Sequence, residues 1–260
     1  MQLDDLNKEI AALNPGEVLI KKGVPEDIYH ASEGEGSTAM REATKSMAHY
    51  RYYKDSERIR TQDMVIGSAI HTLVLEPDLF FDRFVIAPDH LKPGNNKAWI
   101  EWKAAQTLPI LTKREMATVD ATASSVMDRA LPYFSDGVAE KSYWRKDSSG
   151  LILKARIDYE IGDLGIDLKS AKEETPHKFL NKIRYDYNIQ DALYRRVTGL
   201  SDFIFIGACK QPPHAIYAAR QCEKKRAEAN DLISAAIQDI LIAKEFNEYP
   251  LPPIEILETE

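Results

Sequence analysis

Cysteine is scarce in this sequence: Cys209 and Cys222 are the only two, and their spacing matches no metal-binding or redox motif. A reducing cytoplasm is therefore the expected compartment. No run approaches the roughly 20 apolar residues that a membrane-spanning helix needs. The N-terminus also lacks the basic and apolar regions of a secretory signal peptide, so we expect no membrane association.

Linkers and a surplus of basic residues are missing as well. No Pro-, Gly- or Ser-rich tract, internal repeat or low-complexity segment divides the 260 residues, so a single domain is expected. The formal net charge of −7 argues against a protein that coats nucleic acid indiscriminately. It does not exclude an enzyme that acts on DNA, because metal ligands are acidic and basic residues can be concentrated locally.

The order of the expected helices and strands predicts an α/β sandwich with a mixed central sheet. We expect an acidic, irregular N-terminal arm over 1–36, a mainly helical part over 37–135, a core of sheet and helix over 136–222, and a C-terminal helix and tail over 223–260. The expected helices cover 37–55, 64–75, 98–106, 113–131, turns from 176 onward, 188–198 and 223–246. The expected strands cover 138–146, 151–161, 165–169, 203–208 and 215–220.

Two of these strands carry charged residues in alternation. Between Leu151 and Ile161 every odd position is apolar, and four of the five even positions are charged: Lys154, Arg156, Asp158 and Glu160. A period of two places those four on one face of a strand. The short, glycine-bearing connection from Ile161 to Gly165 indicates a hairpin that could bring Asp158 near Asp167.

Asp158, Asp167 and Lys169 at adjoining strand ends suit a site that binds a divalent cation and hydrolyses a phosphodiester. The alternative is a solvated strand face on which acids and bases simply pair. On the following helix, Gln190 and Tyr194 are four residues apart and share a face with Tyr187. These side chains could hold a phosphate or a nucleotide edge, or they could be a partly buried polar pair on an amphipathic helix.

Taken in order, these residues resemble the PD-(D/E)XK nuclease superfamily in its RecB-like branch. The matching pieces are Arg156-Ile157-Asp158, Asp167-Leu168-Lys169-Ser170, and Gln190 with Tyr194. Similarity to the RecE-type exonuclease VIII group lies upstream, in Ile28-Tyr29-His30-Ala31-Ser32, in Ala48-His49-Tyr50-Arg51, and in the run from Gly67 to Pro77 that contains His71. One departure is Ala155, which stands where the superfamily pattern has glycine. The resemblance implies a PD-(D/E)XK core, a mixed sheet flanked by helices, after a helical N-terminal region.

The resemblance also implies roles for the residues. His71, Asp158 and Asp167, with the backbone carbonyl of Leu168, would ligate magnesium, or manganese in its place. Lys169 would orient or deprotonate the attacking water and stabilise charge on the phosphate.

Gln190 and Tyr194 would position the strand, and Glu140 is a further candidate ligand of a metal or water. For His71 the alternative is a packed histidine on an apolar helix, although Gly67, one turn earlier, is expected to leave open space on that face.

The same resemblance implies the substrate and the partners. Linear double-stranded DNA would be digested from 5′ ends to leave 3′ single strands for phage-type recombination. A ring-like homo-oligomer, often a tetramer, and a single-strand annealing protein would be involved. Local basic residues agree with DNA binding, although they could also form a solvated helix face. The candidate contacts are Arg41, Lys45, Arg51, Tyr52, Lys54, Lys182, Arg184 and Arg195.

Two rival functions remain open. Another RecB-like nuclease, such as a CRISPR-associated adaptation nuclease with an iron–sulfur cluster, would need four cysteine ligands, and this chain has two. The other rival is a catalytically silent DNA-binding or scaffold module that keeps the fold. An intact set of two acids and a lysine argues against that second reading.

Overall fold

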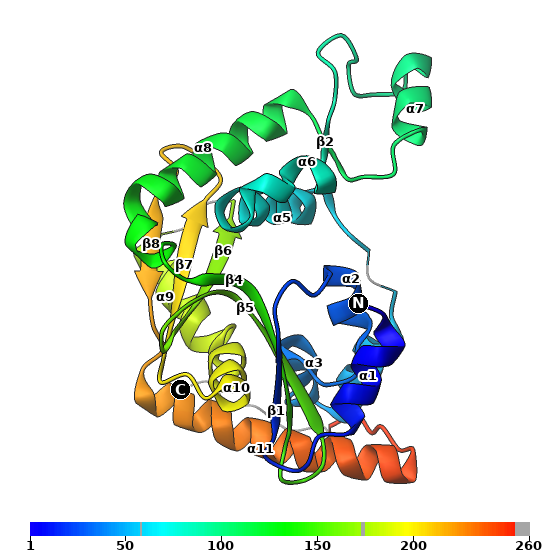
Figure 1. Cartoon of the computed structure of the whole chain (residues 1–260), viewed down its shortest axis with the longest axis vertical. Coiled ribbons are helices and arrows are strands. Elements are labelled where there is room, and N and C mark those ends of the chain that lie inside the picture. Colours follow the sequence, from blue (N-terminus) through cyan, green and yellow to red (C-terminus); the bar gives the residue numbers. More distant parts are fainter. Residues whose placement is uncertain (58, 173–174, 253–260) are drawn as a thin grey trace.

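A six-stranded mixed sheet runs through the protein in the computed structural model, which describes residues 1–57, 59–172 and 175–252 (Figure 1). The strand order is β1-β4-β5-β6-β7-β8, and within this sheet β6 and β7 are parallel while all other neighbours are antiparallel. The strands are β1 (Val18–Lys21), β4 (Val138–Lys146), β5 (Ile152–Ile161), β6 (Leu164–Ala171), β7 (Asp202–Cys209) and β8 (Ile216–Ala219).

Helices cover both faces of this sheet. They are α1 (Leu3–Ala11), α2 (Glu26–Ala31), α3 (Ser37–Ala43), α4 (Met47–Asp55), α5 (Gln62–Leu75), α6 (Phe80–Arg83), α7 (Lys97–Ala104), α8 (Lys113–Ala130), α9 (Pro176–Tyr185), α10 (Asn188–Thr198) and α11 (Glu223–Phe246). Two 3₁₀ turns (Pro77–Leu79 and Leu131–Tyr133) and a small parallel pair, β2 (Val85–Ile86) with β3 (Ile110–Leu111), complete the described elements.

Three apolar clusters hold the layers together. The largest joins α3, α10 and α11 to one face of the sheet, and the second joins α5 and α8 to the other face around Ile166 and Leu168. The third packs α1 and α2 against Trp144 at the β1–β4 end. The predicted fold class, a mixed sheet flanked by helices, is therefore confirmed. In the described part of the chain, none of the helices is both long and apolar enough to cross a membrane.

The hairpin between β5 and β6 forms as expected. Its loop is Gly162-Asp163, and Gly162 has a φ of 56°, a left-handed conformation that glycine adopts without strain. Gly165, the second residue of β6, allows close packing, because a Cβ there would lie 2.5 Å from Cδ2 of Phe203. At Gly165, β6 therefore lies so close to Phe203 of β7 that there is no room for a side chain.

The prediction that four charged residues share one face of β5 is wrong at its last member. Lys154 and Arg156 reach the segment before α3, but Glu160 accepts hydrogen bonds from Lys141 and Tyr143, on the face of the largest cluster. Regular alternation is lost where Glu140 of β4, with a φ of 52°, lies between the pairs Ala139–Tyr159 and Lys141–Ile157, opposite Asp158. A distortion of this kind re-aims side chains, and alternation in one sequence cannot register it.

Two local predictions also need correction. The arm over 1–36 is not irregular: it forms α1, β1 and α2, because Leu6 and Ile10, four residues apart, bury one face of α1 completely. The helix expected over 37–55 is two helices, since Ser46 accepts a hydrogen bond from the His49 N–H (3.2 Å) and starts α4 afresh. The last residues of the predicted tail, 253–260, lie outside the described residues.

Candidate active site

The sheet splits between β5 and β6, and the candidate site lies at the split. The two strands pair only at Tyr159–Ile166, Glu160–Gly165 and Ile161–Leu164, after which β5 continues beside β4 and β6 beside β7 (Figure 1). Asp158 and Asp167 are the next residues on the two sides, so the end of the pairing places them at the point of divergence. Beyond them, Glu35 occupies the freed edge of β5 through hydrogen bonds to Ile152 (2.8 Å) and Lys154 (3.0 Å).

One half of the site joins α5 to β5. Nδ1 of His71 lies 3.5 Å from Oδ2 of Asp158, and the same oxygen accepts a hydrogen bond from the Leu168 N–H (2.8 Å). The Leu168 side chain is wholly buried, so only its backbone takes part. Gly67 leaves less space than expected, because a Cβ there would lie 3.0 Å from Oγ of Ser170. Helix α5, which contains Gly67, therefore packs closely onto the end of β6, which contains Ser170.

The other half joins β6 to α10. Nζ of Lys169 lies 2.7 Å from Oδ2 of Asp167, and Gln190 donates a hydrogen bond to Oδ1 of the same carboxylate. The Lys169 ammonium also lies 4.9 Å from the centre of the Tyr187 ring, which stacks on Phe205. Lys169 is thus held between a carboxylate and an aromatic face, with a quarter of its side chain exposed.

These contacts and the burial of the site shift the acidities of its groups. Burial, together with the Asp167 charge, raises the pKa of Asp158 to about 8, and burial with the Asp158 charge raises the pKa of Glu140 to about 7. Burial lowers the pKa of His71. Burial alone would lower the pKa of Lys169, but Asp167 and Asp158 raise it above its ordinary value. At neutral pH, Lys169 is therefore an ammonium.

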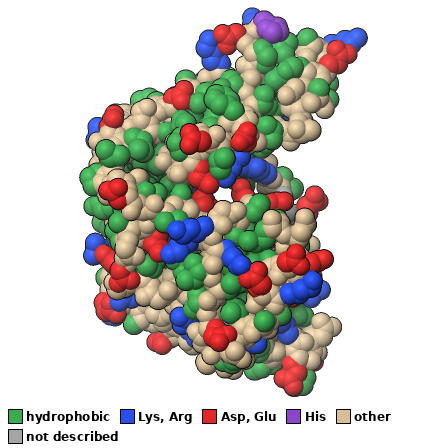
Figure 2. All heavy atoms as spheres, viewed as in Figure 1, with side chains coloured by type: hydrophobic (Ala, Val, Ile, Leu, Met, Phe, Trp, Pro, Cys, Tyr) green, Lys and Arg blue, Asp and Glu red, His purple; other side chains and the backbone are tan. Residues whose placement is uncertain are grey.

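A cavity of about 320 Å³, the catalytic cavity, connects the two halves. Figure 2 shows a hollow between the part of the molecule formed by α5 and α8 and the part below it, with acidic and basic side chains around its rim. The predicted catalytic and metal-binding residues that line the cavity are His71, Asp158, Asp167, Lys169, Gln190 and Tyr194. The structure therefore brings the predicted catalytic side chains together from four separate elements.

Glu140 lies in an adjoining cavity of about 300 Å³, which shares His71, Asp158 and Tyr194 with the catalytic cavity. Its carboxylate oxygen Oε2 is 2.5 Å from Nε of Arg156. That guanidinium also donates to the backbone carbonyl of Val24 (2.6 Å). Glu140, the further candidate ligand, is thus beside the site, but it is paired with a cation.

The donor set suits a hard divalent cation in chemistry and in place, because two carboxylates and an imidazole line one cavity. In the described ranges, however, no three His, Cys, Asp or Glu side chains form a group arranged to hold a metal ion. Both oxygens of Asp167 already have partners, Gln190 on one and Lys169 on the other.

The predicted DNA-binding residues of α3 and α4 lie at different places relative to the cavity. Arg41 lines it, on the same wall as Ser37 and Thr38. Lys54 lines another cavity and lies 3.3 Å from Glu35. Tyr52 is 77% exposed on the surface. Only Arg41 of this group is positioned to meet a phosphate within the catalytic cavity.

The other predicted DNA contacts lie outside the cavity lining. Lys45 and Arg51 pair with nearby carboxylates at 2.7 and 2.6 Å. Lys182 and Arg184 belong to α9, where Arg184 is exposed. Arg195 turns to the far end of α10, where it donates to the Ser201 carbonyl. Their part in DNA binding stays a prediction.

Arg156, Ser37 and Thr38 are further residues of the site that the sequence did not predict. The charged alternation of β5 was a signal for Arg156, since it places Arg156 on the face that carries Asp158. No local pattern signalled Ser37 and Thr38. They enter the cavity because the segment before α3 pairs with the freed edge of β5, which is a long-range contact.

The sequence matches a protein family, and the structure is similar to solved structures. A family model described as a PDDEXK-like domain of unknown function (DUF3799) matches residues 36–252. No curated protein matches the sequence. The crystal structure of a "putative exonuclease" from Eubacterium rectale is similar, with a TM-score of 0.62 and 14% identity over 92% of this chain and 96% of that chain. The structure of SSO0001 aligns with a TM-score of only 0.37 and 11% identity, over 91% and 83%.

Proposed function

The chain belongs to the family of PDDEXK-like domains whose model spans residues 36–252, and we propose that it is a metal-dependent exodeoxyribonuclease. In this proposal it hydrolyses phosphodiester bonds of linear double-stranded DNA. The observation that carries the proposal is that two pairs of side chains lie at one split in the sheet: His71 with Asp158, and Asp167 with Lys169. Two carboxylates, an imidazole and an ammonium around one cavity are suited to phosphodiester hydrolysis.

His71, Asp158 and Asp167 would hold a magnesium ion, with the Leu168 carbonyl as a further oxygen and manganese as a substitute. Such an ion supplies Lewis acidity toward a phosphate and lowers the pKa of water. Because Asp167 now faces Lys169, its carboxylate would have to release the ammonium, at least in part, to take up this role. The released ammonium would then be free to meet the substrate.

Lys169 has the position and the charge to stabilise the transition state. Its pKa is raised by Asp167 and Asp158, so it remains protonated and acts by its charge rather than as the base. Gln190 fixes the carboxylate of Asp167, and the ring of Tyr187 supports the ammonium from the other side. Arg41 and the half-buried Tyr194 line the cavity wall, where they can hold the strand.

The finer parts of the proposal come from the RecE-type resemblance. Digestion runs 5′ to 3′ and leaves 3′ single-stranded tails for recombination by a single-strand annealing partner. The enzyme works as a ring-like homo-oligomer, a tetramer in the simplest case, in the cytoplasm. The fold shared with the E. rectale protein, whose name describes an exonuclease, supports the exonuclease activity without bearing on polarity.

The test uses linear duplexes labelled separately at each 5′ and 3′ end, incubated with and without magnesium, while native mass is measured in parallel. We expect loss of label only with magnesium, first from 5′ ends, and no loss with Asp167→Ala, which also lacks metal binding by calorimetry. Tight binding of intact DNA under both conditions would instead establish a silent DNA-binding module. A native mass equal to one chain would remove the ring from the proposal.

A further inference from the structure

Another cavity, which we call the flanking pocket, opens beside the catalytic cavity. Its volume is about 270 Å³, and its lining includes Tyr29, Gly34, Ser37, Tyr53, Lys54 and Tyr194. Ser37, Thr38 and Tyr194 line both cavities. A flexible ligand can therefore extend from one cavity into the other along α3 and α10.

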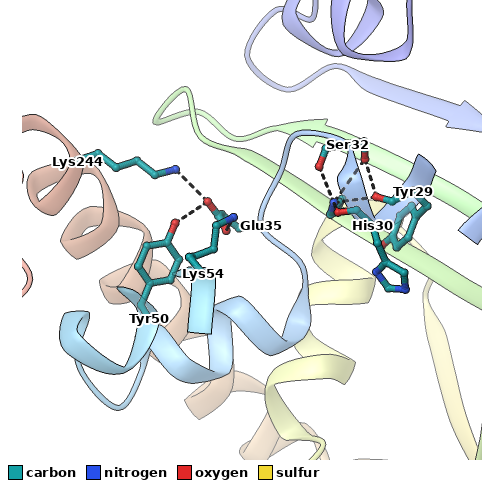
Figure 3. Close-up of polar contacts among 8 residues, drawn as sticks. Tyr29, His30, Ser32, Glu35, Tyr50, Lys54 and Lys244 are labelled. Carbon is teal, nitrogen blue, oxygen red and sulfur yellow. Dashed lines mark hydrogen bonds and ion pairs between the residues drawn. The ribbon is translucent and has the colours of Figure 1, made fainter. Parts of the chain in front are cut away.

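The floor of the flanking pocket is built around a buried lysine. Lys154 of β5 is 7% exposed, and its ammonium donates to the backbone carbonyls of Tyr29 (2.9 Å), His30 (3.2 Å) and Ser32 (2.7 Å) (Figure 3). An ammonium has three protons, and this one is already surrounded by those three carbonyls and the Ser32 hydroxyl (3.4 Å). Lys154 therefore fixes the backbone of residues 29–32 and leaves the recognition of a ligand to its neighbours.

A buried carboxylate next to this floor gathers lysines from distant helices. Glu35, 3% exposed, accepts hydrogen bonds from the Tyr50 hydroxyl (2.7 Å), Lys244 (2.9 Å) and Lys54 (3.3 Å) (Figure 3). The side chains of Lys54 and Lys244 remain 43% and 45% exposed. One carboxylate cannot neutralise both Lys54 and Lys244, so this region keeps a surplus of positive charge that favours an anionic ligand.

The walls add aromatic and hydroxyl groups to that charge. Tyr53 and Tyr194 are half-buried in the lining, beside Ser37 and Thr38. Flat rings next to an exposed ammonium are the combination with which proteins bind single-stranded nucleic acid, by stacking on bases and pairing with phosphates. The pocket is smaller than the roughly 300–1,000 Å³ of pockets that enclose drug-sized ligands, so it suits one nucleoside better than a base pair.

We propose that the flanking pocket binds a single nucleotide of the DNA strand next to the scissile phosphate. Its base lies against Tyr53, and its phosphate meets Lys54. The strand therefore reaches the catalytic cavity unpaired, separated from its complement by at least one nucleotide. This inference rests on the proposed nuclease function, and it adds that the site itself recognises single-stranded DNA.

The experiment measures binding without turnover. A fluorescent, 5′-phosphorylated thymidine tetranucleotide is titrated with the protein in EDTA, at two salt concentrations. The variants are Lys54→Gln and Tyr53→Leu, with Lys224→Gln on the exposed start of α11 as the matched control. Lys54→Gln leaves Glu35 paired with Tyr50 and Lys244, so its fold is expected to persist, and thermal unfolding of each variant checks this.

We expect Lys54→Gln and Tyr53→Leu each to weaken tetranucleotide binding by about five- to tenfold. Lys54→Gln should also flatten the salt dependence, and Lys224→Gln should match the wild type. With duplex substrate and magnesium, Lys54→Gln should raise KM and leave kcat within about twofold, because it does not touch the scissile phosphate.

Unchanged binding in both pocket variants, or equal weakening in the Lys224 control, would overturn the pocket assignment. Digestion of DNA by the wild type would then still support the proposed function. Conversely, a wild type that binds the tetranucleotide through Lys54 and Tyr53 but never digests DNA would refute the nuclease proposal and leave the nucleotide pocket standing.

Discussion

Lys169 is the residue whose removal separates binding from chemistry most cleanly. Its ammonium lies 2.7 Å from Asp167 and over the Tyr187 ring, and it is not itself a candidate metal ligand. We expect Lys169→Ala to lower digestion by at least about 100-fold, since one preorganised charge in an active site contributes roughly 10²–10³ in rate. Metal binding by calorimetry should be retained or strengthened, because the variant removes the ammonium that competes for Asp167. Duplex binding in EDTA should stay within about threefold of the wild type, since one phosphate contact carries only part of the affinity.

Lys224→Ala is the control for that variant, because it also removes one lysine charge, but from an exposed position on α11. It should digest DNA at the wild-type rate. Near-normal digestion by Lys169→Ala would show that this ammonium has no part in the reaction. A loss of metal binding would show that it holds the site together instead.

The raised pKa values of Asp158 and Glu140 predict how stability changes with pH. Their folded-state pKa values, about 8 and about 7, lie above the ordinary carboxyl values near 4, so the folded protein binds more protons than the unfolded chain. Their contribution is therefore fully present below about pH 4 and is lost as the pH rises through 7 and 8. With EDTA present, urea unfolding should show stability falling between pH 5.5 and 8.5.

Asp158→Asn isolates this effect because asparagine does not titrate. We expect the free energy of unfolding to fall less in the variant than in the wild type between pH 5.5 and 8.5, by an amount on the order of a few kcal/mol. An identical slope in the variant and the wild type would show that Asp158 does not hold a proton in the folded protein.

At the same scale, sequence reasoning located the central residues but not their partners. Period-two alternation and the hairpin loop were enough to place Asp158 beside Asp167, and four-residue spacing placed Gln190 with Tyr194. The partners of Asp167 could not be predicted, because which of two nearby cations or amides a carboxylate faces depends on packing distances. The pairing of Arg156 with Glu140 likewise depends on a left-handed residue in β4 that no propensity signals.

Among the elements, the segment between α2 and α3 is attached to the sheet by the Lys154 ammonium as well as by the backbone hydrogen bonds of Glu35 to β5. Lys154→Met keeps most of the chain length but removes the ammonium that three backbone carbonyls share. Two of those hydrogen bonds are buried: the Tyr29 carbonyl would keep the bond from the Ser32 hydroxyl (2.7 Å), whereas the Ser32 carbonyl would lose its ammonium donor. We expect a loss of about 2–4 kcal/mol in the free energy of unfolding.

Urea unfolding measures this loss, and Lys22→Met, an exposed lysine in the turn after β1, is the control with an expected change within about 0.5 kcal/mol. Equal stabilities of the two variants would mean that the segment is held without Lys154. If Lys154→Met is destabilised while Lys154→Arg has the stability of the wild type, the charge-assisted hydrogen bonds are the cause.

Most elements could be predicted because their signals are local. The bounds of β4, α10 and α11 agree with the sequence prediction at both ends, and α8 begins with a capping box formed by Thr112 and Glu115. Among the elements that were missed, α1, β1 and α2 are short or acidic and gain their stability from the distant Trp144. Tertiary packing, which one sequence does not display, decides such segments.

For the whole molecule, the arrangement of layers explains why the site is assembled from distant parts of the chain. The face with α5 supplies His71, and the face with α10 supplies Gln190. Residues of both faces can meet only where the sheet itself opens, and that opening is the divergence of β5 from β6. The fold class followed from the order of elements, whereas the opening depends on where strand pairing stops.

That opening gives the protein a weak line between two well-paired blocks of strands. A ligand in the cavity contacts both blocks of strands. Its binding should therefore slow amide hydrogen exchange at Leu168 and at the neighbouring ends of β5 and β6 more than elsewhere in the sheet. Stiffening of the molecule would then report occupancy directly, even for a ligand that undergoes no reaction.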